Sequence, residues 1–126
     1  KEFRQIINLQ IDYLTKLFHL PISDLEFLVT AWKNLRDCRQ VLKWTFVLAF
    51  YNQSKTQLYA YLQQNLEEFN DRLDELIEND LLAFFPNEEG EEKEIPSKNS
   101  FWQLREKIVN FSNVTANFSR EILQLG

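Results

Sequence analysis

The sequence predicts an all-α fold, an antiparallel bundle of about four long helices that forms one domain over residues 1–126. Along four stretches, apolar residues recur every three or four positions, the spacing that aligns side chains on one face of a helix. No stretch alternates apolar and polar residues between glycine-rich turns, as a half-buried strand would. The 126 residues are 44% hydrophobic, which is enough for one core. Mostly short connections favour antiparallel neighbours.

The first two helices are separated at Pro21. Apolar residues from Phe3 to Phe18 carry the helical spacing, and the first helix is expected to end near His19 or Leu20. Ser23 and Glu26 have the spacing of a capping box, so the second helix is expected to start at Ser23 and to continue toward Phe50.

The third and fourth helices flank an acidic segment. Asn52–Ser54 should end the second helix, and a capping box at Ser54 and Gln57 should start a third that runs to about Leu82. Residues 86–99 are rich in glutamate and contain two prolines, so a mobile acidic loop is expected there. Ser100 and Gln103 predict a third capping box, which opens the last helix.

The stretch from Trp44 to Tyr51 contains one polar residue, Thr45, in a chain whose net charge is −5. A membrane insertion, a packed core and an adhesive face for a partner could each explain it. A membrane span is not expected, because Lys43 and the polar run after Tyr51 interrupt the apolar stretch. Apolar character around most of the helix favours a central, buried helix. The expected core anchors are Trp32, Trp44, Phe46, Phe50 and Phe111.

The residues offer little for catalysis or for binding metals and nucleic acids. His19 and Cys38 are the only histidine and cysteine, and nothing brings them together as base and nucleophile. A zinc site is not expected. The pairs formed by Asp71 with Glu67 and Glu75 have acid–base spacing, but a solvated helix face is the ordinary explanation. The 19 acidic residues outnumber the 14 scattered basic ones, which argues against a nucleic-acid partner.

Binding to other proteins is the function that remains, and the chain is expected to be a non-catalytic docking module. It contains no methionine, so we expect it to be a fragment of a longer chain or a processed form. A single free cysteine indicates a reducing compartment, the cytoplasm or the nucleus.

One segment resembles a known family. The pattern A-W-x5-C-R-x-V-L-K-W-T-x3-A-x-Y, from Ala31 to Tyr51, is similar to the Ariadne domain, the C-terminal helical module of Ariadne-type RING-between-RING ubiquitin ligases. The similarity covers most of the chain apart from the acidic loop. It continues through Tyr61-Leu62-Gln63, Arg72-Leu73, Phe101-x2-Leu104-Arg105-x-Lys107-Ile108 and Val114-Thr115-x-Asn117.

The resemblance implies a regulatory role within a ubiquitin-protein ligase. In such ligases the Ariadne domain restrains the catalytic second RING-type domain, and activation accompanies binding to neddylated cullin-RING ligases. The implied partners are therefore that RING-type domain of the same parent chain and a neddylated cullin-RING ligase. No cofactor is implied for this chain, while zinc is expected in the RING domains of the parent.

The resemblance also suggests interface residues. The restraining contact of the family uses acidic and aromatic residues at the start of the first helix and an acid on the third. Asp71 matches the third-helix acid, although it is shorter, and Glu2 and Phe3 lie near the first-helix position. Two alternatives stay open: an unrelated helical scaffold or adaptor with no link to ubiquitin transfer, and a small enzyme that uses third-helix carboxylates. Cysteine and histidine clusters upstream would favour the ligase.

Overall fold

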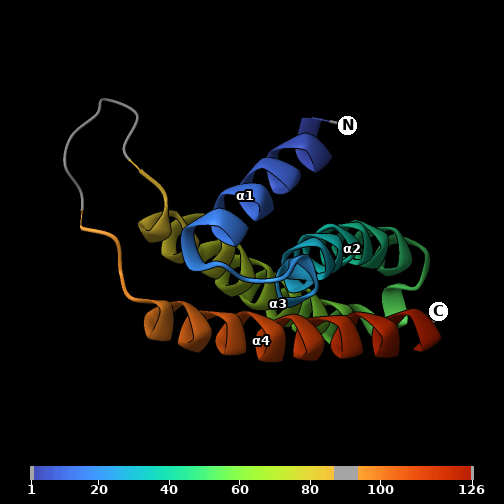
Figure 1. Cartoon of the computed structure of the whole chain (residues 1–126). Coiled ribbons are helices and arrows are strands. Elements are labelled where there is room, and N and C mark those ends of the chain that lie inside the picture. Colours follow the sequence, from blue (N-terminus) through green and yellow to red (C-terminus); the bar gives the residue numbers. More distant parts are fainter. Residues whose placement is uncertain (1, 87–93, 126) are drawn as a thin grey trace.

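The computed structural model describes residues 2–86 and 94–125, and the side chains of residues 4–86 and 94–124. Within these ranges all regular elements are helical and no strand occurs, which confirms the all-α prediction (Figure 1). No helix in the described ranges has the length and apolar character that a bilayer crossing requires.

Three helices form the body of the bundle: α2 (Glu26–Tyr51), α3 (Thr56–Glu75) and α4 (Lys98–Leu125). Each packs against the other two. Consecutive helices run in opposite directions, so that α2 and α4 point the same way (Figure 1). The bundle therefore has two ends, one where α2 and α4 begin and one where they finish.

The core is divided between these two ends. At the first end, the start of α2, the end of α3 and the start of α4 enclose a large cluster that includes Leu28, Leu35, Leu73, Phe101 and Ile108. At the second end the cluster is smaller, and its buried members are Cys38, Val41, Tyr59, Leu62, Leu66 and Ile122. The first end is larger because a fourth helix joins it.

That fourth helix is α1 (Glu2–Phe18), which crosses the first end obliquely (Figure 1). Its side chains Ile7, Ile11, Leu14 and Phe18 enter the large cluster. The helix stops at His19, whose φ of 56° is left-handed. The Leu20 amide then donates to the Thr15 carbonyl at 3.2 Å, the hydrogen bond of a Schellman motif. The predicted end near His19 is confirmed.

The end of α3 departs from regular α-helix. The π-helical segment η3 (Leu76–Asp80) follows α3 directly, and the 3-10 turn η4 (Leu81–Phe84) comes next. Buried side chains of both segments, among them Leu76, Ile77 and Phe84, belong to the large cluster. The predicted extent to about Leu82 is thus right, but its last turns are not α-helical.

Two of the predicted capping boxes are wrong. Ser23 lies inside the 3-10 turn η1 (Ile22–Leu25), and the start of α2 has no side-chain cap. Ser54 lies inside the 3-10 turn η2 (Gln53–Lys55), where its hydroxyl bonds the side chain of Asn52 at 2.9 Å instead. In both places a tight turn precedes the α-helix, so the serine does not hold the extended backbone that an N-cap needs.

The third box is also wrong, because α4 starts earlier. The backbone amide of Ser100 donates to the Ser97 hydroxyl at 3.2 Å, so Ser97 is the cap and Ser100 lies in the first turn. Of the predicted loop 86–99, residues 87–93 lie outside the described residues. Residue 86 and residues 94–97 are non-helical, and Lys98 and Asn99 belong to α4.

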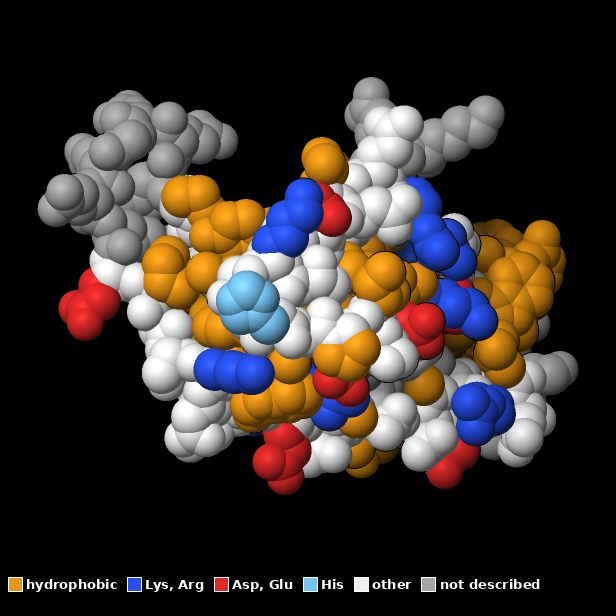
Figure 2. All heavy atoms as spheres, viewed as in Figure 1, with side chains coloured by type: hydrophobic (Ala, Val, Ile, Leu, Met, Phe, Trp, Pro, Cys, Tyr) orange, Lys and Arg blue, Asp and Glu red, His pale blue; other side chains and the backbone are white. Residues whose placement is uncertain are grey.

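The prediction of core anchors is right at the first end and wrong at the second. Trp32 is buried at 9% exposure, and the half-buried Phe111 packs against the large cluster. Trp44, Phe46 and Phe50 are 48%, 54% and 70% exposed. Among the described residues, only α3 and α4 cover α2 at the second end, because α1 crosses the other end, and the rest of the α2 circumference is exposed. Figure 2 shows hydrophobic side chains gathered where α2 ends.

Candidate functional site

Several grooves lie along α1, and we call the two largest together the α1 grooves. The first has a volume of about 500 Å³ and lies between α1 and α2. Its cationic side chains are Arg4, Lys33, Arg36 and Arg39, and its apolar ones are Ile7, Val29 and Trp32. The three cations from α2 recur at helical spacing, so one face of that helix is basic.

The second groove, of about 480 Å³, lies between α1 and η3. Ile7, Trp32 and Arg39 line both grooves. On this side Glu78 and Asn79 take the place of Arg4, Lys33 and Arg36, while Arg39 remains. The two flanks of α1 therefore differ in charge while they share an apolar floor.

Arg39 connects these grooves to α3. Its Nε donates to Asn70 Oδ1 at 3.1 Å, and its Nη2 lies 3.5 Å from Asp74 Oδ1. Asn70 in turn donates a long hydrogen bond of 3.5 Å to Asp71. Arg39 thus links the floor of the grooves with the polar face of α3 that contains the predicted interface residue Asp71.

Glu78 extends this polar group. Burial raises the pKa of the Glu78 carboxyl, the neighbouring Asp74 carboxylate adds to that rise, and Arg39 opposes it. The neighbouring α3 and η3 segments therefore place two carboxylates beside one guanidinium. These charged groups can form new ion pairs with the surface of a partner protein, because the Arg39–Asp74 contact is partly exposed to solvent.

The predicted interface residues are placed only in part. Asp71 is exposed on α3, as a contact residue would be. Glu2 and Phe3 belong to the first turn of α1, but their side chains lie outside the described residues. Sequence reasoning missed Arg39, Asn70 and Asp74. The i,i+4 spacing of Asn70 and Asp74 was the available signal, but their partner lies on another helix.

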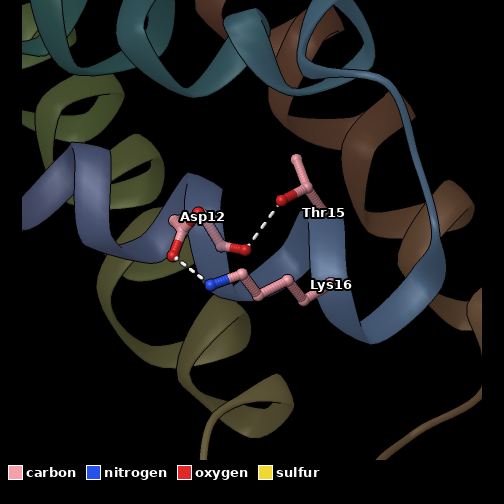
Figure 3. A network of polar contacts seen from close by, with 3 residues as sticks. All are labelled: Asp12, Thr15 and Lys16. Atoms are coloured by element: carbon pink, nitrogen blue, oxygen red, sulfur yellow. Dashed lines mark hydrogen bonds and ion pairs between the residues drawn. The ribbon is translucent and has the colours of Figure 1, made fainter.

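The last turns of α1 carry a local polar network on their exposed side. Lys16 Nζ donates to Asp12 Oδ2 at 3.1 Å, and the Thr15 hydroxyl donates to the Asp12 carbonyl at 2.7 Å (Figure 3). These side chains are largely exposed, so the pair adds little stability.

The catalytic candidates of the sequence do not form a site. Cys38 is buried against the Leu66 carbonyl, whereas His19 is exposed in the turn after α1. Burial raises the pKa of the Cys38 thiol, and Ser119 and Arg39 counteract this only partly. A thiol in such a place is a poor nucleophile.

The α3 carboxylates Glu67, Asp71 and Glu75 are exposed, and the described residues contain no group of three or more potential metal ligands.

Comparison with known proteins identifies relatives over most of the chain. It is 33% identical over 108 residues, 82% of its length, to a protein named "Probable E3 ubiquitin-protein ligase ARI7" of Arabidopsis thaliana. Two others from the same plant carry the same description with the symbols ARI10 and ARI8. They are 37% identical over 78% of the chain and 29% identical over 98% of it.

The chain spans about a fifth of these relatives, between 18% and 22% of their length. No family model matches the chain, and no solved structure does.

Proposed function

Because the chain belongs to the Ariadne-type family of RING-between-RING ubiquitin ligases, we propose that it is the regulatory and docking domain of such a ligase. In this proposal it restrains the catalytic second RING-type domain of its parent and binds neddylated cullin-RING ligases. The parent is then a ubiquitin-protein ligase that acts in the cytoplasm or the nucleus, and the zinc ions belong to its RING domains.

The observation that carries the proposal is the connection of Asp71 to the α1 grooves. Asp71 is exposed, and Asn70 and Arg39 join it to the floor beneath α1. A surface made of exposed polar groups around shallow apolar grooves suits a reversible contact, since little apolar area is permanently covered. A partner that binds only the released arrangement shifts the population by its differential affinity.

The test is the Asp71→Ala variant of the full-length parent. Loss of one charged contact across the restraining interface should raise basal ubiquitin discharge by about fivefold or more. Fivefold corresponds to the lower end of typical coupling free energies between sites. The matched control is Glu67→Ala, one helical turn earlier on α3 and also exposed. Basal discharge that is unchanged in Asp71→Ala, or raised equally in both variants, would refute the restraint.

Cullin binding needs a separate measurement. Purified domain should retain a neddylated cullin-RING complex in a pull-down and should not retain the same complex without the modification. Equal retention of both complexes would show that docking is not regulated by the modification.

A further inference from the structure

The second end of the bundle carries an exposed aromatic surface that the proposed restraint does not use. In the last turns of α2 only one side of the helix, which includes Val41 and Thr45, is buried. The exposed side chains from residue 43 to the helix end are Lys43, Trp44, Phe46, Val47, Phe50 and Tyr51. We call the five apolar ones the aromatic end. Leu58 and Tyr61 continue the exposed apolar character onto the first turns of α3.

The exposed area of the aromatic end is larger than single exposed apolar side chains would give. Its four rings are 48%, 54%, 70% and 80% exposed. An aromatic side chain offers about 150–250 Å² of surface, so these rings leave on the order of 400–600 Å² in solvent. That lies in the upper part of the range of about 300–600 Å² for the largest apolar patch of an ordinary monomer, which is often functional, and it is about half to three quarters of one partner's share of a stable interface.

The charge around the aromatic end indicates what covers it. From Cys38 to Leu66 the sequence has no aspartate or glutamate, whereas Lys43 and Lys55 are positive. This is unusual in a chain whose net charge is −5. Arg39 lies in this stretch too, but its guanidinium is paired with Asp74 of α3. Figure 2 shows Lys and Arg side chains next to the hydrophobic group. A second copy of the chain would place these cations against each other, so self-association is disfavoured, whereas an acidic partner would neutralise them.

A groove adjoins the aromatic end, and its dimensions indicate which kind of partner element can bind there. It has a volume of about 530 Å³ between α2 and α4, and Trp44 belongs both to its wall and to the aromatic end. Along α2 it extends from Lys33 to Trp44, which is about 17 Å of helix. Val41 and Leu123 line it with apolar surface. Its charged side chains are the cations Lys33 and Arg120 and the one carboxylate Asp37, so the lining is positive on balance. Three turns of an amphipathic helix fit this length.

We propose that the aromatic end and this groove dock an amphipathic acidic helix of a separate partner protein. Its apolar stripe covers the rings, and its carboxylates face the lysines and arginines. The choice of a separate protein rests on the proposed function, because in that proposal the α1 side is occupied by the parent's own catalytic domain. The aromatic end is separate from α1, which crosses the opposite end, and the groove shares one residue, Lys33, with the first α1 groove.

The experiment titrates this 126-residue chain with two model peptides. Each peptide has about 18 residues and the same leucine stripe, and its polar positions are glutamate in one and lysine in the other. We expect the glutamate peptide to bind at least about tenfold more tightly. Of the three tryptophan indole NMR signals, that of the exposed Trp44 should shift.

Two variants test the location. Phe50→Ser should weaken binding of the glutamate peptide by about tenfold or more. Leu9→Ser is the matched control, because Leu9 has the same 70% exposure but lies on α1, and it should leave binding unchanged. Both positions are exposed, so thermal unfolding should confirm that both variants fold.

Three outcomes would overturn the proposal. Equal binding of the two peptides, or no binding of the acidic one at about 1 mM, would contradict the stated chemistry. Dimerisation that Phe50→Ser abolishes would assign the surface to a second copy. If this chain binds the glutamate peptide but the full-length parent does not, a segment of the parent itself covers the surface. In none of these cases would the Asp71→Ala result change, so the restraint is tested separately.

Discussion

The side chain of Phe101 joins four elements at the first end of the bundle, and its removal gives the sharpest test of the core. The residue is fully buried. Its ring lies 5.3 Å from that of Phe18 on α1, 5.5 Å from Phe84 on η4 and 6.1 Å from both Phe27 on α2 and Trp102 on α4. One truncation therefore removes ring contacts to α1, α2 and η4 as well as to the neighbouring Trp102 of α4.

The expected cost of Phe101→Ala follows from these contacts. Truncation of a buried phenylalanine costs about 3–5 kcal/mol, and the several ring contacts place this site near the upper limit. With a urea m-value of about 2 kcal/mol per molar, the unfolding midpoint should fall by roughly 2 M. Total stability of such a domain is about 5–15 kcal/mol, so the variant should be weakly folded. Phe101→Leu, at about 1–2 kcal/mol, gives a measurable intermediate.

The matched control is Phe46→Ala, the same change at a ring that is 54% exposed at the other end. We expect it to change the free energy of unfolding by less than about 1 kcal/mol, because most of its apolar surface is already in water. Similar losses for Phe46→Ala and Phe101→Ala would refute the assignment of Phe46 to the surface, and with it the aromatic end.

The remaining predictions concern a cap and a thiol. Ser97→Ala should lower the free energy of unfolding in urea by about 1 kcal/mol, because the Ser100 amide loses its acceptor. Ser54→Ala should change it by less than about 0.5 kcal/mol, because the Ser54 hydroxyl caps no helix. Equal losses in the two variants would contradict the observed starts of α3 and α4. Because burial raises the pKa of the Cys38 thiol, the unfolded chain releases that proton first, and stability should fall as the pH rises above the ordinary thiol value of about 8.5. Urea unfolding across that range should show a smaller fall for Cys38→Ala, and identical slopes would contradict the shift.

The extents of the helices were predictable because apolar residues recur with the helical period, and that period can be read directly from the sequence. The second helix was expected to continue toward Phe50 and ends at Tyr51. The first residues of the helices were less predictable than their extents. A serine followed three residues later by Glu or Gln marks a cap only if the serine has extended backbone, and the 3-10 turns at Ser23 and Ser54 remove that condition.

The candidate site was predictable only where the family resemblance supplied it. Asp71 came from that resemblance, and the structure places it in solvent. The contacts of Arg39 with Asn70 and Asp74 depend on how α2 and α3 are rotated about their axes. A single sequence defines which residues share a face, but it does not define which face of one helix meets which face of the next.

The placement of α1 explains why one half of α2 is buried more fully than the other. A fourth helix that ran alongside α2 for its whole length would cover Trp44, Phe46 and Phe50, as the sequence suggested. Instead α1 crosses the first end, and its apolar side chains from Ile7 to Phe18 are used there in the large cluster. The second end therefore has a three-helix core and an α2 that is apolar on its solvent side as well. That side is the face that a fourth helix would occupy, which is the physical reason to expect a partner helix on it.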